Sequence, residues 1–294
     1  MSRPNCPNCS PPREGFDAEV AFKMLMRRHV DLARLLAQHV GTEALSDLAE
    51  RIVGGFPVAP ATFPECCLVG RRLGNGLEDW FCTGVLIHPR VVLTAAHCYA
   101  PGRTPNVVGL GLDKQYEPTP QAEVVSIKRV VPHPDYVATG VSDIAVLVLR
   151  TAAETLPVPV ATTEQVAAAQ ATTLVGFGNN DLWSASGFGT KRRVSVPIVS
   201  LRRSDADNLD AAETKFDYES DLEFVAGGDG FDTCNGDSGG PAYISVDGEL
   251  RVAGLTSRAA GQPVLPCGDG GIYTRCDAHM DFVRKAVAGF GIEL

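Results

Sequence analysis

The sequence contains no hydrophobic run approaching the roughly 18–20 residues that a helix needs to span a lipid bilayer. Basic residues are also in the minority, with 26 Lys and Arg against 35 Asp and Glu and a net charge of −9. Such a chain offers no basic surface that would attract nucleic acid or an anionic membrane. We therefore expect neither nucleic acid nor membrane among its partners.

A secretion signal is missing as well. The first residues, MSRPNCPNCSPPREGF, have neither the charged start nor the apolar stretch of about 7–15 residues that a signal peptide carries. This favours a cytoplasmic location, with secretion by a non-standard route as the alternative. Arginine outnumbers lysine 20 to 6, which is typical of a GC-rich genome and indicates a bacterial source.

What the chain does contain is the composition of a turn-rich globular protein, with 45% hydrophobic residues, 30 Gly and 20 Pro. Residues 1–14 are rich in Pro, Cys and Ser, and residues 15–50 carry apolar side chains at helical three- and four-residue steps. From Ile52 the pattern changes to short runs of Val, Ile, Leu and Thr separated by Gly, Pro, Asn and Asp. Such runs indicate an all-β sandwich or pair of barrels. Residues 278–290 read as an amphipathic C-terminal helix.

Three of these β-like segments carry residues with chemical potential. LTAAHCYA places His97 after one strand, VSDIAVLVL places Asp143 before another, and CNGDSGGPAYI places Ser238 in a glycine-rich turn. A serine hydroxyl is a poor nucleophile at neutral pH, so an imidazole must take its proton. The imidazole in turn needs a carboxylate that fixes its tautomer and stabilises its cation. Each residue alone has an ordinary structural reading, and the three together indicate an acyl-transfer site.

The glycines beside Ser238 permit tight backbone turns, because they lack a Cβ atom. The amide groups of Gly236 and Ser238 can then converge on one point and form an oxyanion hole. One donor of this kind is worth about 2.7–4 kcal/mol of barrier.

The blocks TAAHC, DIAVL and GDSGGP, with FCTGVLI and GGIYTRC, make residues 52–290 resemble the trypsin/chymotrypsin-like serine proteases. The resemblance implies an all-β fold of two six-stranded antiparallel β-barrels with a C-terminal helix, here preceded by a short helical N-terminal segment. It also implies that His97 is general base and then general acid, that Asp143 orients it, and that Ser238 attacks the scissile carbonyl. His133, in VVPHPDY, falls in another shared block and is expected to be structural.

The resemblance further implies the trypsin-like specificity subgroup. Asp232, six residues before Ser238, corresponds to an acid at the bottom of the primary specificity pocket, where it would select Arg or Lys by charge pairing. The implied substrate-binding residues are Asp232, Thr233, Ser257, Ala259 and Gly271.

Two residues depart from the family pattern at this pocket. Arg258 stands where an aromatic residue is usual, and Ala259 where glycine is usual. An added methyl group would narrow the entrance, and an arginine would change how the residues before the cut are bound.

The nine cysteines cannot all pair within one chain. The resemblance implies two disulfides, Cys82–Cys98 and Cys234–Cys267. In a reducing cytoplasm both would be reduced to free thiols.

We expect no metal or other cofactor. Cys6 and Cys9 have the spacing of half a zinc knuckle, but no second pair follows. Residues 106–124 lack a run of acidic ligands for Ca²⁺.

LAERIVGG (48–55) resembles the activation site of the family. Cleavage between Arg51 and Ile52, by another protease or by self-activation, would free an ammonium group that pairs with Asp237. A buried carboxylate without a partner costs several kcal/mol, which would keep the precursor inactive. The expected domains are a prosegment at 1–51, made of a Cys/Pro-rich tail and a helical segment, and a protease domain at 52–294.

The leading hypothesis is thus a zymogen of a serine endopeptidase that cuts after Arg or Lys in protein or peptide substrates, in an intracellular bacterial proteolytic cascade. The alternative is a catalytically silent protease-fold binding or adaptor module, which the three filled positions disfavour. Residues 15–50 either inhibit the precursor or dock it to a partner.

Overall fold

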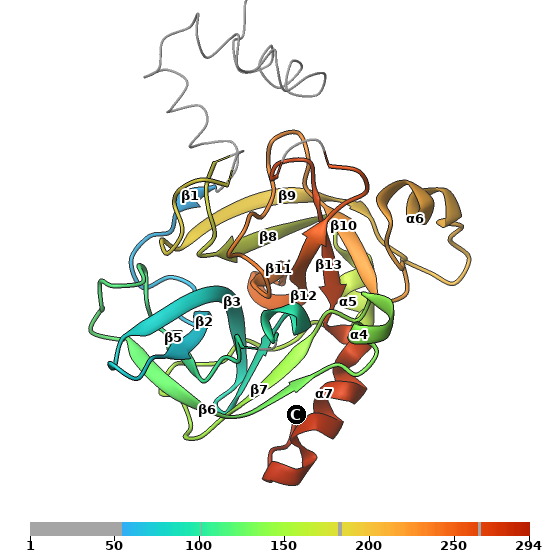
Figure 1. Cartoon of the computed structure of the whole chain (residues 1–294). Helices are drawn as coiled ribbons and strands as arrows, with labels where there is room; N and C mark the ends of the chain where they lie inside the picture. Colours follow the sequence, from blue (N-terminus) through green and yellow to red (C-terminus); the bar gives the residue numbers. More distant parts are fainter. Residues whose placement is uncertain (1–54, 101, 182–183, 264–265) are drawn as a thin grey trace, which may run out of the picture. The chain divides into compact units, whose positions relative to one another are not determined.

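The computed structural model describes residues 55–294 except 101, 182–183 and 264–265. The predicted N-terminal helical segment, Arg51 and Ile52 lie outside the described residues, and so do Cys6 and Cys9. The described chain folds into two antiparallel β-barrels and a few short helices (Figure 1).

The first barrel closes in the strand order β2-β3-β4-β7-β6-β5. Its strands contain the predicted Val-, Ile- and Leu-rich runs, and the central residues of β3, β4 and β7 are buried. β-Branched residues favour strands because their side chains pack well on the surface of a sheet. In a closed barrel each strand is hydrogen-bonded along both edges and turns one face towards the core. The strands are β2 (Cys66–Arg72), β3 (Glu78–His88), β4 (Val91–Thr94), β5 (Val107–Leu110), β6 (Glu123–Pro132) and β7 (Ala145–Leu149).

The second barrel runs in the order β9-β10-β13-β12-β11-β8 and is closed by pairing of β8 with β9. A two-residue strand, β1 (Phe56–Pro57), pairs with the beginning of β9. The prediction of two six-stranded antiparallel barrels is therefore confirmed for the described chain. The strands are β8 (Ala171–Gly176), β9 (Arg192–Ser200), β10 (Glu223–Ala226), β11 (Pro241–Val246), β12 (Glu249–Ala259) and β13 (Gly271–Arg275).

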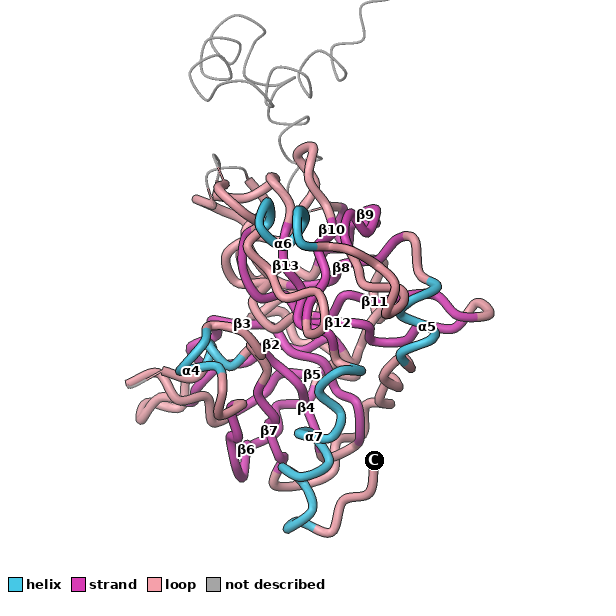
Figure 2. Tube along the Cα trace, turned by 90° about the vertical axis from the view of Figure 1, so that its right-hand side faces the viewer, coloured by secondary structure: helices cyan, strands magenta, loops and turns pink. Residues whose placement is uncertain are grey.

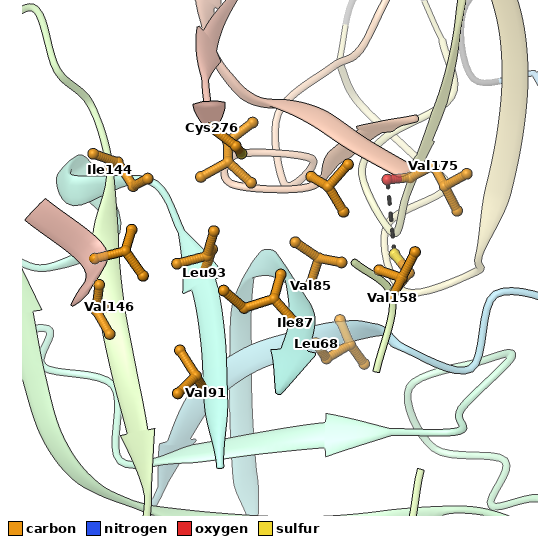
Figure 3. Close-up of a cluster of buried hydrophobic side chains, with 14 of the residues drawn as sticks. Leu68, Val85, Ile87, Val91, Leu93, Ile144, Val146, Val158, Val175 and Cys276 are labelled. Carbon is orange, nitrogen blue, oxygen red and sulfur yellow. Dashed lines mark hydrogen bonds between the residues drawn. The ribbon is translucent and has the colours of Figure 1, made fainter. Parts of the chain in front are cut away.

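One hydrophobic cluster is shared by the two barrels (Figure 3). Leu68 and Val85 of the first barrel belong to the same cluster as Val175 of β8 and Cys276, which follows β13. Burial of apolar surface stabilises by about 25 cal/mol per Å², so this contact fixes the barrels against each other. Residues carried by loops of both barrels are thereby held in one place.

The predicted C-terminal helix is present as α7 (Met280–Val287), with the 3₁₀ turns η2 (Asp277–His279) before it and η3 (Ala288–Phe290) after it. It lies beside β7 of the first barrel and buries Val283 and Val287 (Figure 2). The other short helices are α4 (Tyr136–Thr139), α5 (Thr163–Ala168), α6 (Asp210–Phe216) and the 3₁₀ turn η1 (Ala96–Cys98). No helix in the described part of the chain is long and apolar enough to cross a membrane.

Candidate active site

His97 and Asp143 are brought together by two strands of the first barrel. His97 lies in η1 just after β4, and Asp143 lies just before β7. The Asp143 carboxylate accepts hydrogen bonds from the His97 backbone N–H at 2.9 Å and from its ring Nδ1 at 2.7 Å. A third bond comes from the Ser257 hydroxyl at 2.7 Å. An ionised carboxylate can only accept, so Nδ1 carries a proton and Nε2 is left to accept one.

The turn that carries Ser238 is held against the first barrel, at β3 and at the end of β4. Its carbonyl accepts a hydrogen bond from the Thr83 N–H at 2.9 Å. The next residue, Gly239, has φ +77, and a Cβ there would lie 2.4 Å from the backbone nitrogen of Ala95. Only glycine permits this approach. The Ser238 turn is thus packed against the residues that lead into η1.

The two amide groups expected to form an oxyanion hole sit in this turn. Gly236 has φ +100, and its carbonyl accepts a hydrogen bond from the Thr83 hydroxyl at 2.8 Å, which fixes the orientation of the peptide. Within the described residues, no acceptor is bound to the N–H of Gly236 or of Ser238. Both donors are therefore available to an oxyanion.

Asp232 lies in a pocket of about 80 Å³ that Ser238, Ser257 and Ala259 also line. The residue is 4% exposed. Its Oδ1 accepts hydrogen bonds from the Thr233 N–H at 2.7 Å and from the Tyr273 hydroxyl at 3.1 Å. Burial raises the pKa of the Asp232 carboxyl to about 7, and these hydrogen bonds oppose that rise.

Gly271 makes room for this carboxylate. A Cβ at Gly271 would lie 2.8 Å from Oδ1 of Asp232. The structure therefore brings four of the five expected pocket residues (Asp232, Thr233, Ser257 and Ala259) to the pocket lining, and places Gly271 directly behind the carboxylate.

Comparisons with known proteins agree with this geometry. The family model described as Trypsin matches residues 52–283. The chain is 33% identical to the tryptase of Mus musculus over 253 residues, which covers 81% of this chain and 89% of that protein. The chain belongs to the trypsin family. It is a serine endopeptidase of that family, and the family predicted from the sequence is confirmed.

This trypsin-family chain is also similar to two further proteases along most of its length. It is 29% identical to phenoloxidase-activating factor 1 of Holotrichia diomphalia over 270 residues, covering 80% of this chain and 70% of that protein. It is 28% identical to kallikrein 1-related peptidase b3 of Mus musculus over 273 residues, covering 84% and 94%.

In this trypsin-family protease, Asp237 lines a second, much smaller cavity of about 10 Å³, to which Asp232 and Thr233 also contribute. Its carboxylate accepts hydrogen bonds from the N–H of Gly178 at 2.7 Å and of Cys234 at 2.9 Å. A Cβ at Gly176 would lie 2.1 Å from Oδ1, so glycine is needed there. Burial raises the pKa of Asp237 to about 6, against the lowering effect of the amide donors and of the Arg192 charge.

Arg258, the first departure from the family pattern, forms an ion pair at the edge of the pocket. Its guanidinium binds both carboxylate oxygens of Glu223 at 2.5 and 3.0 Å, and it also donates to the Asp217 carbonyl at 3.0 Å. The Glu223 side chain is fully buried. Glu223 therefore requires this partner, and the arginine is drawn towards β10 while still lining the pocket.

Both expected disulfides are present, Cys82–Cys98 beside His97 and Cys234–Cys267 beside the pocket. Cys66, Cys67 and Cys276 are free and buried. Burial raises the pKa of the Cys67 thiol to about 12, so this thiol is held in its neutral, unreactive form.

His133 lies apart from the pocket. Its ring packs against Phe282 at a centroid distance of 4.4 Å and edge-on against His279 at 5.4 Å. Burial lowers its pKa. The structural role predicted for His133 fits this environment.

Several residues that shape the site were not found from the sequence. Thr83, Tyr273 and Glu223 act through side-chain contacts that depend on strand register, and Phe188 fills the space beside Gly236. Thr83 lies in the block FCTGVLI and Tyr273 in GGIYTRC, but neither block indicated which side chain faces the site.

Proposed function

We propose that the protein cleaves polypeptides after Arg or Lys by a Ser-His-Asp acyl-enzyme mechanism. The observation that carries this proposal is the buried Asp232 carboxylate in the same pocket as Ser238. A substrate side chain that reaches this carboxylate leaves its scissile carbonyl at the pocket mouth, next to the serine.

The proposed steps use the groups described above. Nε2 of His97 takes the proton of the Ser238 hydroxyl as Oγ bonds to the scissile carbonyl carbon, and the carbonyl oxygen becomes an oxyanion held by the two amide groups of the turn. The imidazolium passes its proton to the leaving amine, which departs. A water molecule then repeats the sequence on the acyl-enzyme. Asp143, with its three hydrogen bonds, stabilises the cation that forms twice in the cycle.

Specificity for a cation follows from the burial of Asp232. A carboxylate with few donors around it gains a charge-assisted, bidentate partner when a guanidinium enters, and a neutral side chain would leave the charge unpaired. Ala259 adds one methyl group to the pocket lining. The pocket therefore favours slender, unbranched side chains, which both Arg and Lys have.

Replacing Asp232 with serine is expected to lower kcat/KM for arginyl substrates by roughly 10²–10³-fold, because the cation loses a buried ion-pair partner. Hydrolysis of an otherwise identical substrate with a neutral residue before the cut should change little. Asp247→Asn, at an exposed acid in the turn between β11 and β12, is the matched control. Equal losses on the arginyl and neutral substrates would contradict the role of Asp232.

The raised pKa of Asp232 predicts how ligand binding depends on pH. Because the carboxyl titrates at about 7, it is ionised at pH 8 and mostly protonated at pH 6. Binding of an aryl amidine to the Ser238→Ala protein, measured by calorimetry, should weaken about tenfold over this interval. In Asp232→Asn the affinity should be low and flat with pH. A flat profile in the unsubstituted pocket would contradict this prediction.

We further propose that the protease is made as a zymogen, activated by cleavage between Arg51 and Ile52. The cavity at Asp237 supports this, because it is lined by Arg192 and Val194 of β9. Gly55 approaches the same strand so closely that a Cβ on it would lie 1.9 Å from the Arg193 carbonyl, and β1 pairs with Arg192 and Arg193. Gly55, three residues after the proposed cut, is therefore held against the strand that lines the cavity.

For the cellular role we propose a step in a proteolytic cascade. The chain is similar to a protein whose name, phenoloxidase-activating factor 1, states that it activates another protein. The partners would be a protein substrate, an activating protease unless activation is autocatalytic, and a docking partner for residues 15–50. The predicted bacterial source and cytoplasmic location belong to this proposal.

A further inference from the structure

Two cysteines and the imidazole of the active site form a metal-ligand cluster. The ligand atoms of Cys82, His97 and Cys98 all lie within 4.8 Å of one another. In the described part of the chain, this is the one group of three or more His, Cys, Asp or Glu side chains placed closely enough to hold a metal ion. The sulfur of Cys98 also lies 3.6 Å from the Ser238 carbonyl oxygen, so the cluster borders the catalytic turn.

While Cys82 and Cys98 are joined, their sulfurs are poor ligands, because thiolates rather than disulfides bind metal ions. Reduction changes this. A dithiol gives two electrons and two protons to the disulfide, and is itself oxidised to a cyclic disulfide. The products on the protein are two thiols that remain side by side, since their Cα atoms are only 6.3 Å apart.

We propose that the reduced protease binds Zn²⁺ through Cys82, Cys98 and His97, and that this ion inhibits it reversibly. Zinc bonds to sulfur at about 2.3 Å and to imidazole nitrogen at about 2.0–2.1 Å, so tetrahedral ligands lie about 3.4–3.8 Å apart. After reduction the two sulfurs must move apart to reach that spacing, and the imidazole ligand atom already lies within 4.8 Å of both. Binding displaces two thiol protons to solvent and leaves the fourth position to water.

The surroundings of His97 suit a zinc ligand. Its Nδ1 donates to Asp143 at 2.7 Å, which is the carboxylate–histidine arrangement that orients imidazole ligands of zinc. Nε2 is thereby the nitrogen available to the ion. The His97 side chain is 30% exposed, whereas Cys82 and Cys98 are 3% and 2% exposed. An ion can therefore enter from the cleft and be held by two shielded sulfurs.

The inhibitory part of this proposal rests on the proposed function, in which Nε2 of His97 accepts the serine proton. An ion bound to Nε2 occupies the lone pair that must accept this proton. The redox state of the disulfide would then decide whether zinc inhibits the enzyme. The oxidised protease keeps a free Nε2, whereas zinc inhibits the reduced protease. Metal binding itself does not depend on catalysis and can be measured separately.

Binding is tested with Co²⁺ as a spectroscopic probe on the full-length Ser238→Ala protein carrying Cys6→Ser and Cys9→Ser, which removes the cysteine pair that has the spacing of half a zinc knuckle. The protein is measured oxidised, and again after reduction by a dithiol and removal of the reductant without air. We expect one Co²⁺ with sulfur-to-cobalt charge-transfer bands in the reduced protein only. Adding His97→Gln should weaken binding, and adding Cys82→Ser with Cys98→Ser should remove the bands.

Equal bands in the oxidised and reduced protein would overturn the proposal, and so would bands that survive the Cys82/Cys98 substitution. Reduction also opens Cys234–Cys267. Bands that remain when Cys234→Ser and Cys267→Ser are added assign the metal to Cys82 and Cys98 even if the Cys82/Cys98 variant does not fold, and bands lost with that change would overturn the proposal.

The effect on activity is measured with the active wild-type enzyme and an arginyl substrate. We expect Zn²⁺ to lower the rate of the reduced enzyme about tenfold or more at a concentration that leaves the oxidised enzyme unchanged, with recovery on chelation. Equal inhibition of the oxidised and reduced enzyme by Zn²⁺ would overturn the proposal that the disulfide controls inhibition. Absence of any arginyl hydrolysis would instead count against the proposed function and leave the cobalt result standing.

Discussion

Replacement of Ser238 by alanine is expected to reduce kcat/KM for an arginyl amide substrate by about 10⁶-fold. The loss is this large because the serine, His97 and Asp143 act as one unit, and without the hydroxyl no acyl-enzyme forms. The fold should be retained, because the turn is held by backbone contacts of Ser238 and Gly239 that alanine preserves. Steady-state kinetics measures the loss of kcat/KM, and circular dichroism checks that the fold is retained.

The matched control is Ser245→Ala, at an exposed position of β11 outside the site. Labelling with a fluorophosphonate gives a second readout, since this reagent reacts only with activated serines. It should mark the wild-type enzyme and the Ser245 variant, but not Ser238→Ala. Activity retained by the pure Ser238 variant would show that the catalytic assignment is wrong. Failure of the wild type to label would favour the silent binding module.

Replacement of Arg51 by glutamine is expected to leave an uncut precursor with kcat/KM lower by roughly 10³-fold or more. The reason is the carboxylate of Asp237, which is buried and has two amide donors but needs a cation to balance its charge. Without the ammonium of Ile52, the several kcal/mol that an unpaired buried charge costs act against the active arrangement of the neighbouring turn. The measurement compares activity with the chain length seen by mass spectrometry.

Two variants sharpen this test. Arg51→Lys keeps the basic cleavage site and should still be cut and activated. Asp237→Asn should be cut normally yet stay largely inactive, because the receiver of the new terminus is gone. The zymogen proposal fails if Arg51→Gln is fully active while uncut.

The sequence predicted most of the strands, including the short β4 and β7, whose residues continue clear Val- and Leu-rich runs, but it missed β5, β10 and β13. The runs in β3, β6, β9, β11 and β12 are long enough for their pattern to identify them. By contrast β5, β10 and β13 have only four or five residues, all buried on both faces, so no alternation of polar and apolar residues marks them. Their strand state is fixed by the neighbours that they pair with in the closed barrels.

The site shows the same division. His97, Asp143 and Ser238 lie in motif blocks that the family resemblance identifies directly. The Arg258–Glu223 pair joins residues 35 positions apart across β13, and nothing local links them. Lys191 is a similar case, because a lysine just before a strand is ordinarily solvated. Here its ammonium is buried and donates to the carbonyls of Thr62 and Phe63 at 3.2 and 2.9 Å.

The central claim is that one pocket joins the Asp232 carboxylate to a reactive Ser238, and it is tested most directly by a cleavage profile. A library of peptides made from a digested proteome is treated with the active enzyme, and the residue before each new cut is read by mass spectrometry. The account predicts cuts almost entirely after Arg and Lys, lost together in Ser238→Ala. Cuts without preference for a basic residue, or cuts that persist in the alanine variant, would contradict it.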